Sequence, residues 1–382
     1  MAGRKSIDVG VVGTYFESLS DPRHSRNRKH LLVDIIVIAI CGIISNAEGP
    51  TAIHRWAKAH APWLARFLRL PKGIPSRDCI RRLLIALQPQ AFQKCFEAWI
   101  RDSLETDSRG ARRLVAIDGK CCRGSHDRSR ELGPLHIVSA WASEQGIALG
   151  QVATEEKSNE ITAIPQVLNL IDLAHSIVTI DAIGCQKAIV KQIDKSGGTF
   201  VIAVKDNQPK LFEAAREVVR QKLEGEAEEL QYRVHETQDE GHGRIDERAY
   251  GVLKLPRNFP LRKEWPSLKA VGYATRVTVH ADGTETDDTR YYILNEYLSG
   301  RRFAEAVRGH WGIEAMHWVL DVNFREDQQQ TAERTLVNNL SWLRRFAVTL
   351  LKRDKNDKES LRGRMQIAGW NTDYLEQVLL AK

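Results

Sequence analysis

Two aspartates in this chain each follow a short apolar segment of the same kind. LVAIDGK (Leu114 to Lys120) contains Asp118, and IVTIDAIG (Ile177 to Gly184) contains Asp181. Both segments predict a buried strand that ends in a carboxylate. Ligands of open α/β sheets bind outside the strand ends, and Mg²⁺ takes hard oxygen ligands. The sequence therefore predicts that the two carboxylates meet at a divalent cation, and such a site calls for a third acid.

The segment RGHWGIEAMHWVLDVNFRED (Arg308 to Asp327) is the densest in functional side chains. On a helix, residues three and four apart share one side, so one face here presents acid, imidazole and indole groups together. That face comprises His310, Glu314, Trp318 and Asp321, with His317 beside them. It can point at a metal ion and at a nucleic acid. The alternative is an ordinary amphipathic helix, with a core of apolar residues and solvated charges.

Hydrophobic periodicity divides the chain into regions, and these regions must position the acids. Residues 1–105 have helical periodicity and predict a helical N-terminal domain. In residues 106–228 and 299–353, three strands precede alternating helices and strands, which predicts a core with a mixed α/β sheet. Short β-like runs between turns predict a β-rich insertion at 229–298. Residues 354–382 are expected to form a C-terminal helical tail.

Composition narrows the class of protein. The 382 residues carry a formal net charge of +7 with a pI near 9.0, which favours a polyanionic partner. The six cysteines form no C-x₂-C pair, so we expect free thiols in a reducing cytoplasm and no zinc site. The apolar run from Leu31 to Ser45 contains Asp34 and falls short of the ~20 residues that a bilayer requires. It predicts a buried helix, and we expect no membrane association.

Six motifs, in this order and spacing, carry a resemblance to a known family. They are AIDGK, KSNEITAIP, VTIDAIGCQ, AVKDNQP, GHGRIDER and HWGIEAMHWVLDVNFRED. The chain resembles the DDE transposases of bacterial insertion sequences, in the branch that contains the H-repeat-associated proteins. The resemblance implies a ribonuclease H-like catalytic core in which Asp118, Asp181 and Glu314 bind two Mg²⁺ ions, with Mn²⁺ as a substitute.

The resemblance also implies an activity and partners. The expected function is metal-dependent cleavage and transfer of DNA strands at the ends of an insertion sequence. The expected partners are the terminal repeats and target DNA, with the N-terminal domain binding the DNA ends and two copies pairing them as a homodimer. The expected location is the bacterial cytoplasm, at the nucleoid when the protein is bound to DNA.

One departure from the wider class affects the third acid. Many such transposases have a Y-x₂-R-x₃-E-x₆-K pattern around the glutamate, and Val307, His310 and Asp321 stand here at the places of its Tyr, Arg and Lys. The roles of the Arg and Lys therefore do not transfer. Rival third ligands remain at Asp321, Glu326 and Asp327.

Basic residues near the first aspartate and in the N-terminal region predict DNA contacts, because Lys and Arg neutralise phosphates. The predicted DNA-binding residues are Arg112, Arg113, Lys120, Arg123, Lys205, His310, Trp311, Arg26, Arg28 and Lys29. Trp311 and Trp318 either stack on an unpaired base or pack the helix, and packing is the favoured interpretation. His242, Arg244 and Glu247 either approach DNA or belong to a polar hairpin turn.

Other functions remain open at this point. A relic that keeps the fold and binds DNA but no longer transposes is the main alternative. A glycosidase would use an acid pair without metal, and it gives no reason for the basic residues. Glu314 and His317 match half of a di-iron bundle motif, but no second half is present in the sequence.

Overall fold

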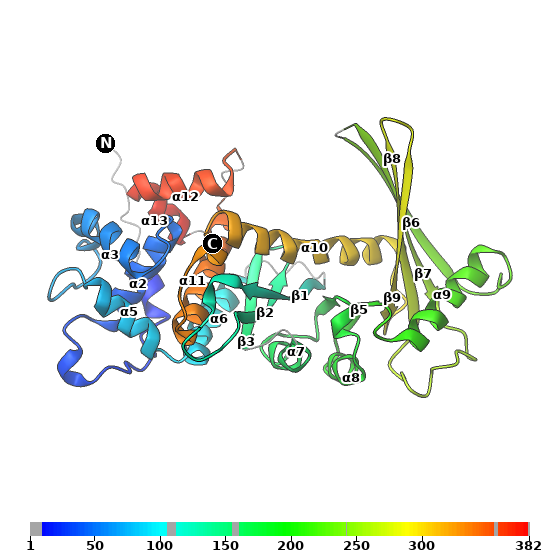
Figure 1. Ribbon diagram of the computed structural model, residues 1–382, viewed down its shortest axis with the longest axis horizontal. Coiled ribbons are helices and arrows are strands. Elements are labelled where there is room, and N and C mark those ends of the chain that lie inside the picture. Colours follow the sequence, from blue (N-terminus) through cyan, green and yellow to red (C-terminus); the bar gives the residue numbers. More distant parts are fainter. Residues whose placement is uncertain (1–9, 105–111, 155–159, 242, 355–357, 381–382) are drawn as a thin grey trace.

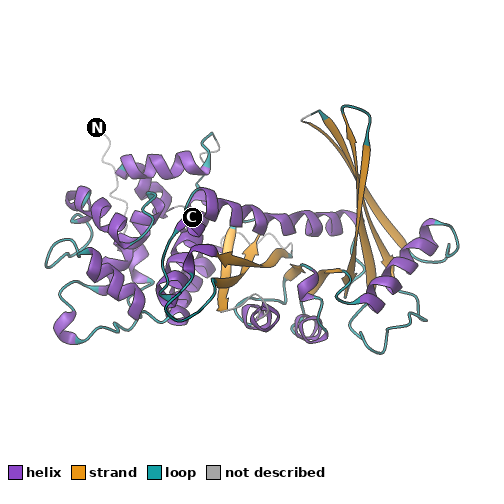
Figure 2. Cartoon of the chain, viewed as in Figure 1, coloured by secondary structure: helices purple, strands orange, loops and turns teal. Residues whose placement is uncertain are grey.

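The computed structural model describes residues 10–104, 112–154, 160–241, 243–354 and 358–380. Three parts follow one another along its long axis: a group of helices, a sheet covered by helices, and a ribbon of four long strands (Figure 1, Figure 2). His242 and the start of the KSNEITAIP motif, at 157–159, lie outside the described residues.

Five strands form the centre of the sheet, in the order β3-β2-β1-β4-β5. They are β1 (Arg113–Cys122), β2 (Leu135–Ala142), β3 (Ile147–Thr154), β4 (Ser176–Ile180) and β5 (Thr199–Val204). The first three pair antiparallel, whereas β4 and β5 run parallel to β1. β4 is buried along its whole length, as its apolar sequence predicts. The predicted mixed α/β sheet of ribonuclease H-like type is confirmed.

Helices cover both faces of this sheet (Figure 1). α7 (Glu160–Leu168) and α8 (Lys187–Lys195) lie on one face, and α10 (Gly300–Val322) and α11 (Arg334–Arg353) lie on the other. Ser299 begins α10, because its side chain accepts a hydrogen bond from the N–H of Arg302. Buried apolar residues then hold α10 across the sheet: Phe303, Val307, Ile313, Met316 and Leu320.

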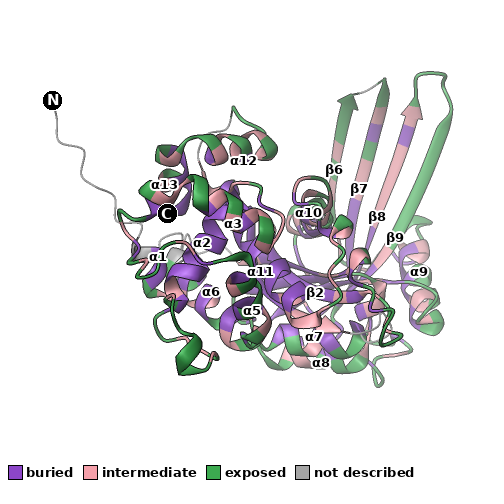
Figure 3. Cartoon of the chain, turned by 60° about the vertical axis from the view of Figure 1, so that its left-hand side comes forward, coloured by how far each residue is buried: buried purple, intermediate pink, exposed green. Residues whose placement is uncertain are grey.

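The β-rich insertion is not a separate sheet. Its strands β6 (Tyr232–Gly241), β7 (Arg244–Lys254), β8 (Ala270–His280) and β9 (Glu285–Leu294) form an antiparallel ribbon. β9 pairs antiparallel with β5, so the ribbon continues the central sheet to nine strands. α9 (Pro209–Leu223) packs against β8 and β9. The far ends of the ribbon are exposed (Figure 3), while its near end packs under α10.

The N-terminal helices share one hydrophobic core with the sheet. They are α1 (Gly10–Thr14), α2 (Leu32–Ile44), α3 (Pro50–Ala59), α4 (Ala61–Leu64), α5 (Arg77–Ala86) and α6 (Pro89–Leu104), joined by α12 (Leu361–Trp370) and α13 (Thr372–Leu380) from the other end of the chain. α2 is buried almost throughout, as its apolar run predicts, and α11 packs between α2 and β3. In the described part of the chain, no helix has the length and apolar character needed to span a membrane.

Candidate active site

The first two acids lie side by side because β1 and β4 are parallel neighbours. Ile117 pairs with Ile180, so Asp118 in β1 and Asp181, the residue after β4, occupy equivalent positions. The Asp181 carboxylate accepts a hydrogen bond from the N–H of Ile183 at 3.1 Å, which fixes it at the end of its strand. The sequence prediction of two adjacent strand-end carboxylates therefore matches the geometry.

Glu314 approaches the same point from α10, which crosses over β1 and β4. Burial raises the pKa of Asp118, a backbone hydrogen bond at Gly119 lowers it, and the nearby carboxylates of Asp181, Glu160 and Glu314 raise it; together these effects bring the pKa to about 7. Burial also raises the pKa of Glu314. Carboxylates that perturb one another in this way are close enough to repel. The charges of the three predicted acids therefore interact with one another.

Two histidines of α10 contact the strands that carry the aspartates. His317 Nδ1 lies 3.5 Å from Asp118 Oδ2, and burial lowers the pKa of His317 to about 3, so the ring is neutral at pH 7. His310 Nδ1 lies 3.0 Å from Thr179 Oγ1 in β4, and burial lowers the pKa of His310. A neutral ring that is hydrogen-bonded to β4 does not suit the phosphate contact predicted for His310. The geometry favours a role in orienting α10 on the sheet.

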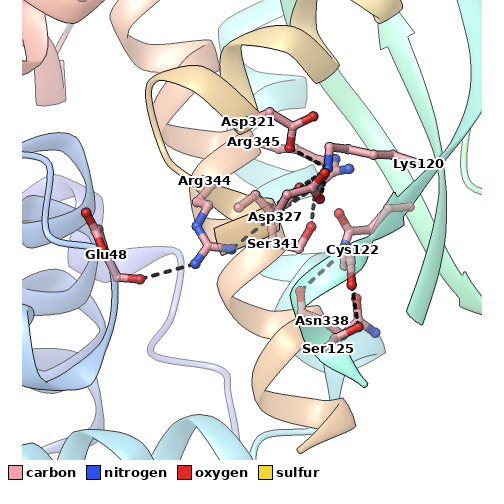
Figure 4. A network of polar contacts seen from close by, with 12 residues as sticks. Glu48, Lys120, Cys122, Ser125, Asp321, Asp327, Asn338, Ser341, Arg344 and Arg345 are labelled. Atoms are coloured by element: carbon pink, nitrogen blue, oxygen red, sulfur yellow. Dashed lines mark hydrogen bonds and ion pairs between the residues drawn. The ribbon is translucent and has the colours of Figure 1, made fainter. Parts of the chain in front are cut away.

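Lys120 lies inside the protein, at the centre of an ion-pair network (Figure 4). Its side chain is 5% exposed, and its Nζ lies 2.7 Å from Asp321 Oδ1, 2.9 Å from Asp327 Oδ1 and 3.5 Å from Glu326 Oε2. These carboxylates raise the pKa of Lys120 despite its burial. The structure contradicts the predicted DNA contact of Lys120, because its charge is already neutralised out of reach of a phosphate.

The same network accounts for the three rival third ligands. Asp321 and Asp327 are paired with Lys120, and Glu326 Oε1 lies 3.3 Å from Arg344 Nη1 and 3.6 Å from Arg345 Nη1. Glu326 is buried within this group, whose members come from β1, from α10 and the turn after it, and from α11. The three rivals are thus already paired with cations, whereas Glu314 raises the pKa of Asp118 and has its own pKa raised by Asp181, which favours Glu314 as the third acid.

Two of the predicted DNA contacts lie at the wrong end of the strands. Arg112 binds both carboxylate oxygens of Glu296 and donates to Thr199 Oγ1 at 2.7 Å, where β5 begins. Arg113 begins β1 beside Ser176, where β4 begins. Asp181 stands at the opposite end of β4, so the structure contradicts a role for Arg112 and Arg113 at the acids. Arg112 and Arg113 are close to Asp118 in sequence, but the extended strand β1 separates them from it in space.

The other predicted contacts are exposed. Lys205 follows β5 directly, at the same edge of the sheet as Asp181, and Arg123 follows β1 with its Nε 3.5 Å from Asp327 Oδ2. The N-terminal basic residues Arg26, Arg28 and Lys29 also lie at the surface. Of these, Arg28 donates hydrogen bonds to two backbone carbonyls of its own loop. Unlike the buried Lys120, these exposed side chains can reach a phosphate.

The tryptophans of α10 are exposed, so the favoured packing interpretation is wrong. Trp311 is 49% exposed and Trp318 is 60% exposed. The guanidinium of Arg290 in β9 lies 5.2 Å from the centre of the Trp311 ring, a cation–π distance. Arg290 also lowers the pKa of Glu314, against the effect of its burial.

Trp311 and Arg290 line a hollow of about 410 Å³ between α10 and the strand ribbon. We call it the arginine hollow; its charged and aromatic lining is Arg248, Tyr250, Arg276, Asp288, Arg290, Tyr292, Arg308 and Trp311. The sequence analysis missed it. The local signal is weak: β8 and β9 contain one arginine each, Arg276 and Arg290, and this does not reveal that α10 lies against the ribbon.

The acids suit a hard divalent cation in kind, since they supply only oxygen ligands and repel one another. Within the described residues, no group of three or more His, Cys, Asp or Glu side chains is already drawn together as a metal-binding cluster. Asp118, Asp181 and Glu314 still come from three elements that converge, and a divalent cation would offset their repulsion.

Comparisons with known proteins identify the family. The model of the transposase DDE domain matches residues 109–350, and the model of the DDE-associated region matches residues 14–100. The "H repeat-associated putative transposase YhhI" of Escherichia coli (strain K12) is 36% identical over 94% of this chain and 95% of its own length. The "Putative transposase YncI" of Escherichia coli O157:H7 is 35% identical over 96% of this chain and 93% of its own length.

One solved structure that the chain matches is the piggyBac transposase synaptic complex with hairpin DNA. It matches with a TM-score of 0.44 and 10% identity, over 99% of this chain and 83% of that chain. The family models and the two sequence relatives together cover nearly the whole chain. On this evidence, the chain belongs to the DDE transposase family, in the group of the H-repeat-associated proteins.

Proposed function

We propose that this protein is the transposase of an insertion sequence, which cuts DNA strands at the element ends and joins them to target DNA with the help of Mg²⁺. The observation that carries the proposal is the convergence of Asp118, Asp181 and Glu314 from β1, β4 and α10. Family membership gives this convergence its chemical meaning, because the same three acids are those that the DDE motifs select.

In this proposal the three carboxylates hold the cations. Bound Mg²⁺ ions would activate water or a 3′-hydroxyl on one side and stabilise the leaving oxygen on the other. Asp118, Asp181 and Glu314 are the residues that would hold these ions. His317, with Nδ1 3.5 Å from Asp118 Oδ2, is neutral and therefore does not neutralise the charge of Asp118, so the carboxylate remains available as a ligand.

The DNA backbone would follow the edge of the sheet where Asp181 lies. Exposed Lys205 stands at this edge, and the arginine hollow opens beside Glu314 on α10. Its arginines suit phosphates, and exposed Trp311 suits stacking on a base. Two copies of the chain would pair the two ends of the element.

Lys205→Ala is expected to weaken DNA binding about threefold to tenfold and to reduce the salt dependence of binding by about one phosphate contact. Fluorescence anisotropy with a duplex from the element end, measured over a series of salt concentrations, checks this. The matched control is Lys269→Ala, because Lys269 is also exposed but lies near Glu296, at the opposite end of the strands. Equal losses in the two variants would contradict the proposed path of the DNA.

The function itself is tested with a plasmid that carries this gene and its native flanking DNA. The unaltered protein should cut at the borders of the gene when Mg²⁺ is present, and Asp181→Asn should bind the same DNA but not cut it. Loss of one carboxylate ligand is expected to cost at least about a thousandfold in cleavage rate. Binding without cleavage by the unaltered protein, in both Mg²⁺ and Mn²⁺, would instead indicate a DNA-binding relic.

A further inference from the structure

A fourth acid, Glu160, lies at the site on the side away from Glu314. Glu160 begins α7, which covers the face of the sheet opposite α10 (Figure 1). It is 5% exposed, a degree of burial that is rare for a glutamate. His136 in β2 is one neighbour, with Nδ1 3.6 Å from Glu160 Oε1. A buried carboxylate beside a carboxylate site needs a physical reason.

The carboxylate of Glu160 lies directly against the backbone of β1, one residue after Asp118. A Cβ placed on Gly119 would stand 2.5 Å from Glu160 Oε1, 2.6 Å from its Cδ and 3.0 Å from its Oε2. Real Cβ atoms do not approach other atoms this closely, so only glycine leaves room for the carboxylate. The glycine of the AIDGK motif therefore has a steric role, which is to admit Glu160 to the strand that carries Asp118.

The contact with Gly119 places the Glu160 carboxylate beside the residue that follows Asp118 in β1. Two carboxylates near neighbouring residues of one strand repel each other, and that repulsion is offset when a divalent cation binds.

We propose that Glu160 is a further ligand or close supporter of the metal ions, so that the cation at Asp118 meets carboxylates from both faces of the sheet. This inference rests on the proposed metal-dependent function and extends it from three acids to four. The competing explanation is structural: a glutamate in the first turn of a helix stabilises that helix through its dipole. A structural role changes stability but leaves metal affinity unchanged.

The first experiment measures Mn²⁺ binding to the full chain without DNA, by the loss of the free-Mn²⁺ signal in electron paramagnetic resonance. Glu160→Gln is expected to weaken the tight site about tenfold or more, since outer and inner ligands of metal sites each contribute on this scale. Mn²⁺ affinity within twofold of the unaltered protein would overturn the proposal. Thermal unfolding of the metal-free variants shows whether the fold is kept.

A second pair of variants tests the steric link and remains informative if Glu160→Gln folds poorly. Gly119→Ala should weaken Mn²⁺ binding about tenfold, because the added methyl group displaces the Glu160 carboxylate. In a Glu160→Ala background these three close contacts are absent, so Gly119→Ala should then have less than a twofold effect. Equal effects in both backgrounds would show that Gly119 acts independently of Glu160 and would overturn the proposal.

The outcomes separate this inference from the function on which it rests. If the unaltered protein binds Mn²⁺ and cuts DNA, and Glu160→Gln does both equally well, the fourth acid is excluded and the transposase proposal stands. If the unaltered protein binds no Mn²⁺, both are overturned. Asp118→Asn serves as the reference, because it should abolish the tight site in either case.

Discussion

Asp118→Asn is expected to abolish strand cleavage and, at the same time, to stabilise the metal-free protein above pH 7. Cleavage should fall at least about a thousandfold, since one of the carboxylates that would hold the cations is lost. Stability should rise because the raised pKa of Asp118, about 7 against an ordinary value of 3.8, means that the folded state favours the protonated acid. Asparagine resembles that neutral form at every pH.

The sign and the pH range follow from proton linkage. The folded state binds the Asp118 proton more tightly than the unfolded state, so the unaltered protein loses stability as the pH rises from about 4 to about 7. Above pH 7 the deficit is complete, and we expect Asp118→Asn to be more stable by on the order of 2 kcal/mol. At pH 4 the two proteins should differ little.

Urea unfolding in EDTA, at pH 5 and pH 8, measures this difference directly. Asp206→Asn is the matched control, because Asp206 is an exposed acid at the end of β5 and surface substitutions change stability by less than about 0.5 kcal/mol. Adding Mg²⁺ at pH 8 should reduce the advantage of Asp118→Asn, since the cation stabilises only the ionised acid. A variant that is less stable than the unaltered protein at pH 8 would refute the assignment of repulsion at Asp118.

Lys120→Met is expected to lower the free energy of unfolding by about 3–5 kcal/mol, the cost of removing one partner from a buried ion pair. Lys120 is the shared cation of Asp321, Glu326 and Asp327, and it joins β1 to the turn after α10. Burial disfavours the charge on Glu326, yet Arg345, Arg344 and Lys120 lower its pKa to about 2. Without Lys120, part of this negative charge is left buried and uncompensated.

Arg123→Ala is the control for Lys120→Met. Arg123 pairs with the same Asp327 at 3.5 Å, but its side chain is 81% exposed, so its loss should change stability by less than about 1 kcal/mol. Urea unfolding at pH 7 compares the two. If Lys120→Met unfolds like the unaltered protein but binds DNA more weakly, the original prediction of a phosphate contact is right and the network is incidental.

Local sequence was sufficient to predict the parts of the site that depend on secondary structure. The apolar runs before Asp118 and Asp181 indicate buried strands, and parallel pairing then places the two acids together. Glu314 was identified from helical spacing and from the motif around it. The buried helix at Leu32–Ile44 and the four strands of the insertion also follow from hydrophobic periodicity alone.

Partners distant in sequence were not predictable in this way. From its sequence neighbours, Lys120 is a basic residue close to a catalytic acid. Its burial depends on ion pairs with Asp321, Glu326 and Asp327, which lie far along the chain. Trp311 reads locally as a packing residue, and its exposure depends on how α10 crosses the ribbon. A side chain on a helix has the same local pattern whether its face meets a core, a partner or solvent.

The sequence by itself determined the strands, the helices, the order of the motifs and two of the three acids at the strand ends. Only the tertiary structure decided that β9 pairs with β5 and that the charge of Lys120 is neutralised by carboxylates inside the protein. It also decided that Glu160 contacts Gly119 from the face of the sheet opposite α10. The physical reason is that secondary structure follows the periodicity of neighbouring residues. Ion pairs, burial and close contacts follow instead from which surfaces pack together, and those surfaces come from segments far apart in the chain.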